Sequence, residues 1–429
     1  MSTSTSTSKK RNFRDAMATG FLRELLDDHA APDSPPEADL PPRVAHALIS
    51  DAATARASDI HIEPGENSAL IRFRVDGVIS DVSKVTLAQA RMIINQIKAM
   101  ANLDPIVTFT PRDAHASYTV GAAPLDLRLA LVPSHTGEAL TIRLLDPRRL
   151  QRSIEDLGFD LGELQLLESW IESGAGMFLA AGPTGSGKTT TIYSLLQELK
   201  KSDRAIVSLE DPVEYQLDGI VQVQLDQRHH LNYADGIKSM LRLDPDYLMI
   251  GEIRDAVSAR AAVDAAISGR VLLSTLHSRD AVGALTSLRN WGLQDHEIAE
   301  ALSVVVGQRL VRRLCTHCRR RRAVSAKERV WLSSAGLAVP EQVSDAEGCD
   351  RCSQIGYKGR CGIFELWNLT EPDYEAILRH TDEHAVRRSL VDRKHKSIIA
   401  NGLDKVVDGI TSVAELRRAA SGAFLAKSL

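Results

Sequence analysis

The chain has 429 residues, of which 44% are hydrophobic and 25% are charged, and its formal net charge is −4. This length and composition are ordinary for a globular protein of two or three domains. The charge excludes a global attraction to nucleic acid or anionic lipid. No apolar run approaches the ~20 residues that span a bilayer, and the first residues lack the apolar core of a secretory signal, so we expect a cytoplasmic protein.

Residues 1–41 are predicted to be a disordered tail. Ser/Thr repeats open this segment, and a proline-rich stretch from Ala30 to Pro42 closes it with little to bury. Between them, Phe13 to Leu26 could form one short amphipathic helix. We expect this helix to have no special role, although docking on a partner is an alternative.

Residues 42–150 are predicted to form an α/β domain. The period of the apolar residues changes between about 3.6 and 2 along this segment, which indicates that helices alternate with strands. The predicted helices cover residues 44–53 and 86–100, and the predicted strands cover residues 60–62, 69–75, 126–132 and 139–145. Residues 146–149 are predicted to be the exit linker.

A complete phosphate-binding loop follows the buried strand predicted at residues 177–181 and precedes a helical pattern at residues 190–199. Such glycines let successive N–H groups face phosphate oxygens, and the helix N-terminus adds partial positive charge. This context predicts ATP binding, with Lys188 on the outer phosphates and the Thr189 hydroxyl on Mg²⁺. The predicted nucleotide-binding residues are Gly182, Pro183, Thr184, Gly185, Ser186, Gly187, Lys188, Thr189 and Thr190.

Strands and helices alternate from Leu157 to about Gly307, which is typical of a mostly parallel sheet. Ligands of such sheets bind at the carboxyl ends of the strands. Polar residues follow each of the four predicted strands, at residues 177–181, 205–209, 247–250 and 271–275. They are the phosphate-binding loop, Glu210 to Glu214, Gly251 to Asp255, and Leu276 to Ser278. We expect these four segments to converge on one nucleotide site.

Among the acidic residues, Glu252 is the first candidate to polarise the attacking water, and Glu210 is the second. Many phosphate-loop enzymes carry an Asp at the position of Gly251, so Mg²⁺ is expected to be held by Thr189 and the phosphates. For Asp211 and Glu214 the alternative is a place in a solvated turn. His277 is either a sensor of the γ-phosphate or a hydrogen-bonded core histidine.

Two Cys-x-x-Cys pairs predict a closed four-thiolate zinc site of structural type. A disulfide is unfavourable in the reducing cytosol, and Cys361 is left over as a buried thiol. The predicted ligands are Cys315, Cys318, Cys349 and Cys352. Nearby, residues 308–322 hold seven arginines and no acid. This cluster could be a solvated face, or it could contact lipid headgroups or an acidic partner.

The motifs together resemble those of the secretion ATPases of type II secretion and type IV pilus assembly. The resemblance rests on the phosphate-binding loop and on the segments at residues 210–214, 241–255 and 274–278. The segments at residues 57–64, 71–77 and 402–412 extend it to roughly residues 42–420. It implies an N-terminal α/β (PAS-like) motor domain, a RecA-like ATPase domain over residues 151–310, an inserted four-cysteine zinc module over residues 311–365, and C-terminal helices over residues 366–429.

The resemblance also implies a homo-hexamer that hydrolyses ATP between subunits. Such a ring drives pilus or pseudopilus assembly through an inner-membrane platform protein, with which it associates peripherally. Arg72 and Arg74 match arginines that reach nucleotide at the subunit boundary, and they share one strand face because they are two residues apart. The alternative for Arg72 and Arg74 is a structural one, in which they lie on a solvated face of the sheet. The zinc module is found in secretion and pilus-extension members, which favours assembly over retraction.

Three departures accompany the resemblance. The segment before Val44 is too short for the extra domain with which many members dock on a membrane recruiter. A Pro-Gln-Asp-Gly-Arg-like turn is missing near residues 110–115, and a family arginine is replaced by Gln96. A zinc-ribbon ring motor for nucleic acid is the alternative function, but 4% aromatic residues leave few stacking platforms. A nucleotide-binding scaffold without turnover is disfavoured by the intact Lys188, Glu252 and His277.

Overall fold

The computed structural model describes residues 43–121, 123–146, 151–201, 204–225 and 233–424. The predicted tail, with its helix from Phe13 to Leu26, lies outside these residues, as does most of the predicted linker. The chain divides into two compact units. The first holds residues up to Arg149 together with Cys315–Arg320 and Ala346–Gly359, and the second holds the remainder.

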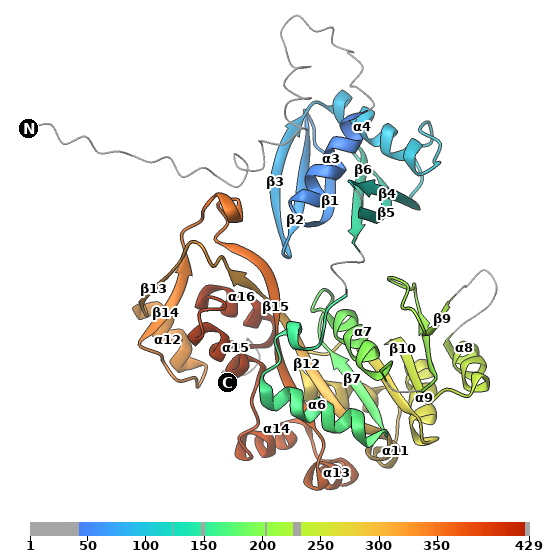
Figure 1. Cartoon of the computed structure of the whole chain (residues 1–429), viewed down its shortest axis with the longest axis vertical. Helices are drawn as coiled ribbons and strands as arrows, with labels where there is room; N and C mark the ends of the chain where they lie inside the picture. Colours follow the sequence, from blue (N-terminus) through green and yellow to red (C-terminus); the bar gives the residue numbers. More distant parts are fainter. Residues whose placement is uncertain (1–42, 122, 147–150, 202–203, 226–232, 425–429) are drawn as a thin grey trace, which may run out of the picture. The chain divides into compact units, whose positions relative to one another are not determined.

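The first unit is built on a six-stranded antiparallel sheet in the order β3-β2-β1-β6-β5-β4 (Figure 1). Ala69, Ile71 and Phe73 alternate along β2 and are buried, and together with the apolar faces of α3 and α4 they form one core. The elements are α3 (Arg43–Thr54), β1 (Ala57–Pro64), β2 (Ala69–Val75), β3 (Val78–Val85), α4 (Leu87–Met100), β4 (Arg112–Val120), β5 (Ala123–Ser134) and β6 (Gly137–Leu145).

Most elements predicted for this unit are confirmed, but β3 and β4 were not predicted. Both are edge strands of the sheet, and β4 reads Arg-Asp-Ala-His-Ala-Ser-Tyr-Thr-Val, with no fully buried residue. An edge strand has one pairing partner and gives up little apolar surface to the core, so its hydrophobic pattern is weak. Helix α4 begins after Thr86, whose side-chain hydroxyl accepts a hydrogen bond from the Gln89 backbone N–H. The Gln89 side chain in turn accepts from the Thr86 backbone N–H, which completes a capping box.

The second unit is built on a seven-stranded sheet in the order β15-β12-β7-β11-β10-β8-β9. Parallel pairing runs from β12 across to β9. Alternate residues of β7 face opposite sides, so that Phe178 packs with α6 and α7 while Leu179 packs with α9 and α10. The strands are β7 (Met177–Ala181), β8 (Ile206–Glu210), β9 (Val221–Gln224), β10 (Tyr247–Ile253), β11 (Val271–Leu276), β12 (Leu302–Leu314) and β15 (Tyr357–Asn368).

Helices cover both faces of this sheet, as in other doubly wound α/β folds. They are α6 (Leu161–Ser173), α7 (Lys188–Leu199), α8 (Tyr233–Met240), α9 (Ala256–Ile267), α10 (Ala281–Asn290) and α11 (Asp295–Ala301). The C-terminal part is helical as predicted, with α13 (Glu371–Leu378), α14 (Glu383–Asp392), α15 (Ile398–Val407) and α16 (Val413–Phe424). No helix among the described residues is long and apolar enough to cross a membrane.

Two strands connect the sheet to the cysteine segment. β12 continues through residue 310, the predicted domain boundary, and ends just before Cys315, while β15 returns the chain to the sheet. Between them lie α12 (Ala326–Ser334) and a two-stranded sheet of β13 (Arg319–Ala323) and β14 (Gln342–Ala346). Strand β10 is also longer than predicted, because it continues past Gly251 to Ile253, with a break in its register against β11 after Ile250.

Candidate nucleotide site and cysteine cluster

The phosphate-binding loop connects the fully buried β7 to α7, as predicted. Its shape requires glycine at two positions. A Cβ atom at Gly182 would lie 2.6 Å from the Gln308 carbonyl oxygen, and Gly187 has a φ of +91°. Both arrangements exclude an ordinary side chain, since the first is a clash and the second is left-handed backbone. The loop therefore turns directly into the N-terminus of α7, where anions bind favourably.

Gln308, on β12, forms hydrogen bonds to this loop and to the helix that follows it. The sequence did not indicate it as a site residue. Its Nε2 donates to the Ser186 carbonyl at 2.8 Å, and its Oε1 accepts from the Thr191 hydroxyl at 2.9 Å. The residue is 2% exposed, so both bonds are shielded from water. The available signal was its position directly after the buried apolar run of residues 304–307, like the other strand-end polar residues.

The Lys188 ammonium lies under the loop and is turned toward the chain itself. Nζ donates to the Gly182 carbonyl at 2.8 Å and to that of Pro183 at 3.3 Å, and it lies 3.4 Å from His277 Nδ1. Burial lowers the pKa of Lys188 to about 8, although the negative charge of Glu252 opposes this shift. A phosphate group would offer the buried ammonium a counter-charge in place of neutral carbonyls.

Glu252 lies on β10 and receives a donor on each carboxylate oxygen. His277 Nε2, at the end of β11, lies 2.6 Å from Oε1, and Arg254 Nε donates to Oε2 at 2.8 Å. The Glu252 side chain is 18% exposed, and that of His277 is 50% exposed. His277 is therefore not a buried core histidine. The structure brings Lys188, Glu252 and His277 together in one connected network.

Gly251, the residue before Glu252, lies close to the backbone of the neighbouring strand β8. A Cβ atom there would lie 3.3 Å from the Leu209 carbonyl oxygen and 3.4 Å from Glu210 Cα, both backbone atoms of the neighbouring strand. The Gly251 carbonyl also accepts the hydroxyl of Thr275 at 2.8 Å. A side chain at this position would require the neighbouring backbone to shift by a few tenths of an ångström, so the close approach of β8 favours glycine here.

Glu210 is fully engaged inside the protein, although the sequence placed it second for catalysis. The residue is 2% exposed, and its carboxylate accepts from Ser208 at 2.6 Å, from Gln222 at 3.1 Å and from the Tyr193 hydroxyl. Burial, with Glu210 beside it, raises the pKa of Tyr193 far above its usual value, which keeps the hydroxyl a donor. Glu210 thus joins β8 to α7 and to β9.

Asp211 and Glu214 differ in their surroundings. Asp211 Oδ2 accepts from Arg254 Nη1 at 3.1 Å, so Arg254 bridges the acidic segment after β8 to Glu252 on β10. The Glu214 backbone amide donates to the Tyr193 hydroxyl at 3.3 Å.

Thr189 is exposed at the start of α7, where its hydroxyl is open to a ligand.

Arg72 and Arg74 belong to the first unit and share one face of β2. Arg72 forms an ion pair with Glu63, and Arg74 Nε lies 3.4 Å from Asp59 Oδ2. Both acids are on the neighbouring β1. The arginines are therefore not among the residues that the second unit brings together around Lys188.

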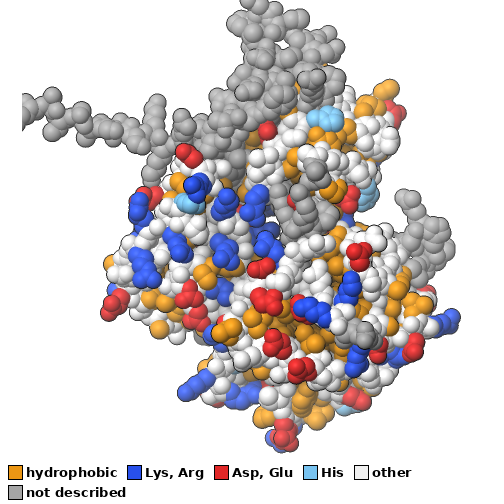
Figure 2. Space-filling model, viewed as in Figure 1, with side chains coloured by type: hydrophobic (Ala, Val, Ile, Leu, Met, Phe, Trp, Pro, Cys, Tyr) orange, Lys and Arg blue, Asp and Glu red, His pale blue; other side chains and the backbone are white. Residues whose placement is uncertain are grey.

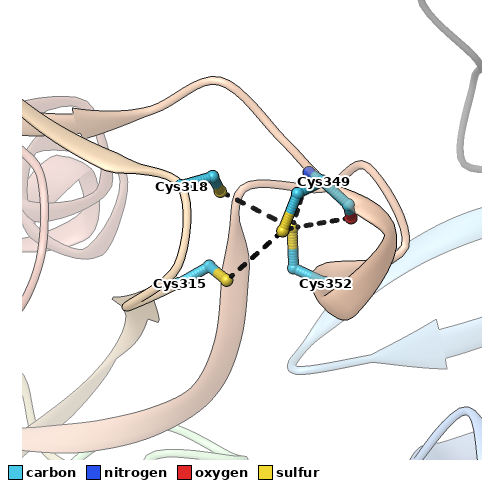
Figure 3. Close-up of side chains that lie close together, drawn as sticks. All are labelled: Cys315, Cys318, Cys349 and Cys352. Carbon is cyan, nitrogen blue, oxygen red and sulfur yellow. Dashed lines mark hydrogen bonds between the residues drawn. The ribbon is translucent and has the colours of Figure 1, made fainter.

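The four predicted zinc ligands converge, with every Sγ within 4.8 Å of the others (Figure 3). The Sγ separations are 3.9 Å for Cys315–Cys349, 3.8 Å for Cys318–Cys352 and 3.7 Å for Cys349–Cys352. Zn–S bonds of ~2.3 Å in a tetrahedron require sulfur atoms about 3.8 Å apart. These thiols are not disulfide-bonded, and Cys361 is buried outside the cluster. The donor set and its geometry fit Zn²⁺.

Backbone amides support the sulfur atoms. The N–H groups of Cys349 and Gly356 point to Cys352 Sγ at 3.2 and 3.3 Å. Such bonds stabilise thiolate charge and orient metal ligands. The left-handed backbone of Gly348, with φ of +96°, lets the second Cys pair turn toward the first.

The arginine cluster next to these cysteines is partly neutralised. Arg312 pairs with the buried Glu415, and Arg322 pairs with Glu328 and Asp345. Arg320 and Arg321 are exposed on β13, and Arg320 Nε lies 3.8 Å from the equally exposed Glu347 Oε2. Figure 2 shows Lys and Arg side chains gathered over this part of the chain.

Comparison with known proteins identifies relatives over most of the chain. Residues 37–418 match the family described as type II/IV secretion system protein. A putative type II secretion system protein E of Escherichia coli is 42% identical over 88% of this chain and 76% of its own length. The type II secretion system ATPase E of Vibrio cholerae is 38% identical, over 88% of this chain and 74% of its own length.

Solved structures share the fold at lower identity. The Legionella pneumophila ATPase DotB matches with a TM-score of 0.65 at 20% identity, over 91% of this chain and 98% of DotB. The pilus retraction motor PilT, solved with bound ADP, gives 0.57 at 20% identity, over 87% of this chain and 95% of its own. The predicted α/β architecture with a RecA-like ATPase domain is confirmed.

Proposed function

This chain belongs to the type II/IV secretion system protein family of secretion ATPases, and from that premise we propose that it powers pseudopilus or pilus assembly as a cytoplasmic homo-hexamer. In this proposal, the ring hydrolyses ATP and works on an inner-membrane platform protein, with which it associates peripherally. A membrane recruiter is a further partner, and nucleic acid is not one. The relatives in type II secretion support the first part, and the alternative of a nucleic-acid motor has no such support.

One observation carries the catalytic part of the proposal: Lys188, Glu252 and His277 form a continuous network at the carboxyl ends of adjacent strands. We assign the β- and γ-phosphates of ATP to the loop of residues 182–190 and to Lys188. Thr189 would hold Mg²⁺, which neutralises phosphate charge in enzymes of this type. Contact with phosphate would draw Lys188 away from the carbonyls of Gly182 and Pro183.

Glu252 is assigned to orient and polarise the attacking water. Both of its oxygens already have a donor within hydrogen-bonding distance, and we propose that one of these donors moves aside so that the attacking water is oriented by the carboxylate. His277 is the better candidate, because it is half exposed and lies between Glu252 and Lys188. An imidazole that leaves Glu252 for the γ-phosphate would report whether that phosphate is present. Glu210 has no free place for water among its three donors, and we assign it a positioning role.

Arg72 and Arg74 are proposed to act on the nucleotide of a neighbouring subunit. The four cysteines are proposed to hold one structural Zn²⁺, which would fix the ends of β12 and β15. The functional parts would then be residues 42–150 as the N-terminal motor domain, 151–310 as the ATPase domain, 311–365 as the zinc module and 366–429 as the C-terminal helices.

Mixing two inactive variants tests whether Arg72 and Arg74 act on the nucleotide of a neighbouring subunit. A chain with Arg72→Ala and Arg74→Ala keeps its own Lys188 and Glu252, whereas a Glu252→Gln chain can still donate its arginines. We expect the mixture to recover part of the ATPase activity, since positioned arginines contribute ~10³-fold or more to phosphoryl transfer. Specific activity of the unmutated protein should rise with concentration as rings assemble.

Arg143→Ala is the matched control, because Arg143 also contacts Asp59, at 3.2 Å, but comes from β6. It should leave activity near that of the unmutated protein. If mixed variants co-assemble and recover no activity, the arginines act within their own chain or serve only to pair with Glu63 and Asp59.

A further inference from the structure

The segment of residues 277–280 connects β11 to α10, and its last residue is bonded to the C-terminal helix α14. Asp280 is the N-cap of α10, where its Oδ1 accepts the Gly283 amide at 2.9 Å. Arg387 of α14 donates to both carboxylate oxygens of Asp280, from Nη1 to Oδ2 at 2.6 Å and from Nη2 to Oδ1 at 2.7 Å. Such a bidentate contact fixes the orientation of the carboxylate as well as its distance.

The Arg387–Asp280 pair is largely shielded from water. The Arg387 side chain is 14% exposed, and that of Asp280 is 18% exposed. Arg387 Nε also donates to Glu383 Oε1 at 3.0 Å, and Glu383 Oε2 accepts from the Thr286 hydroxyl of α10 at 2.9 Å. A shielded ion pair adds little net stability compared with apolar side chains of similar size, so stability alone does not account for this one.

Helices α10 and α14 do not need the ion pair in order to pack together. Apolar residues of both helices belong to one buried cluster, which includes Leu285 and Val386. The N-terminus of α10 is likewise capped by the side chain of Asp280 itself, without help from the arginine. What Arg387 adds is a fixed position for the carboxylate of Asp280.

The segment of residues 277–280 is short and carries further bonds of its own. The Ser278 hydroxyl donates to the Asp280 carbonyl at 2.7 Å, and the guanidinium of Arg309 on β12 donates to the Arg279 carbonyl. His277 begins this segment and Asp280 ends it. A shift of Asp280 would therefore be passed along a bonded segment to the imidazole.

We propose that Arg387 is a positioning residue for His277. By fixing Asp280, it sets where the imidazole lies relative to Glu252, which is 2.6 Å away, and relative to the γ-phosphate of bound ATP. This inference rests on the proposed function, in which His277 reports the γ-phosphate. It gives helix α14 (Figure 1) a part in the reaction that the proposed function does not assign to it.

Arg289 offers a matched control at the other end of α10. Its side chain is also 14% exposed, and it pairs with Asp295 at 2.7 Å. Its Nη1 donates to the Thr381 carbonyl at 2.7 Å, so it too connects α10 to the C-terminal part of the chain. Loss of Arg289 should therefore lower stability as loss of Arg387 does, without reaching His277.

Affinities of the full chain for two nucleotides test the proposal. The Kd for Mg-ADP and the Kd for Mg-AMP-PNP, a non-hydrolysable ATP analogue, differ by the contribution of the γ-phosphate. Arg387→Met should raise the Kd for AMP-PNP about fivefold to tenfold and leave that for ADP unchanged, because a misplaced imidazole loses a charge-assisted hydrogen bond. Arg289→Met should change neither Kd while it lowers the melting temperature by a similar amount.

Arg387→Lys keeps the test decisive even if Arg387→Met does not fold. Lysine retains the positive charge beside Asp280, but it cannot form the bidentate contact. This variant should fold and should show the same selective loss of AMP-PNP affinity, at a smaller size.

His277→Ala separates this inference from the proposed function. It should weaken AMP-PNP binding selectively, and the added Arg387→Met change should weaken it no further, because the arginine acts through the imidazole. If His277→Ala is selective and neither Arg387 variant is, the positioning role is wrong and the proposed function stands. Additive effects in the double variant, or an equal loss of ADP affinity in the Arg387 variants, also overturn the positioning role. If His277→Ala leaves both Kd values unchanged, the proposed sensor role of His277 fails, and this inference fails with it.

Discussion

The imidazole of His277 lies 2.6 Å from the carboxylate of Glu252, although the two residues come from different strands. Strands β10 and β11 are parallel neighbours, and both residues lie at their carboxyl ends. The same imidazole is 3.4 Å from Lys188 Nζ, so the residue proposed to bind phosphate and the residue proposed to polarise water are connected through one side chain.

Glu252→Gln should retain nucleotide binding and lose hydrolysis. An amide is isosteric with the carboxylate, but it cannot accept the proton of the attacking water, and general-base catalysis contributes ~10²–10⁴-fold. Phosphate release and binding of a fluorescent ATP analogue measure the two properties separately. The comparison variant is Glu210→Gln, which should mainly lower the melting temperature because Glu210 holds three donors inside the protein. Wild-type turnover by Glu252→Gln would transfer the role to Glu210.

ATP binding should weaken as the pH rises above about 8. Burial lowers the pKa of Lys188 to about 8, so the nucleotide-free protein loses the charged form of this residue between pH 7 and 9. Phosphate binds the charged form, so the Kd for Mg-ATP should increase about tenfold over this range, since it follows the protonated fraction. Equilibrium titrations at constant ionic strength measure it.

Lys188→Ala should abolish binding or turnover at every pH. Lys201→Ala, which changes a lysine whose side chain is 72% exposed, should keep the full pH dependence. A Kd for the unmutated protein that stays constant between pH 7 and 9 would show that the nucleotide-free Lys188 remains charged.

Gln308→Leu should weaken nucleotide binding by about tenfold, because a bond to a buried carbonyl is lost and that carbonyl is left unpaired, at a cost of ~1–3 kcal/mol. The phosphate-binding loop would lose its support at Ser186 while Lys188 itself stays intact. Gln342→Leu, at an exposed position on β14, provides the control for the same chemical change. Unchanged ATP affinity in Gln308→Leu would mean that the loop keeps its shape without the brace.

One equivalent of zinc per chain is expected by elemental analysis. Cys315→Ser or Cys349→Ser should reduce the zinc content and the melting temperature, because structural zinc binding contributes on the order of 10 kcal/mol to folding. Cys361→Ser should leave the zinc content unchanged, since this thiol lies in another hydrophobic cluster. Metal-free protein of unaltered stability would refute the assignment.

The sequence by itself determined the local parts of the site. The phosphate-binding loop, β7 and α7 are contiguous, so spacing and period were sufficient to predict them, and the same holds for each Cys-x-x-Cys pair. That the four strand ends converge also followed from the sequence, because parallel strands present their carboxyl ends at one edge. The weak patterns of the edge strands β3 and β4 contained too little apolar signal to be recognised.

Only the tertiary structure decided which polar groups contact one another. The sequence ranks Glu252 before Glu210 as the residue that polarises water, but it does not show their contacts: Glu210 accepts from Ser208, Gln222 and Tyr193, whereas Glu252 lies between His277 and Arg254. Gln308 braces a loop more than a hundred residues earlier in the chain, and the two Cys pairs meet across a 34-residue separation. Such contacts depend on how strands order themselves in a sheet, which is a long-range property that no local pattern contains.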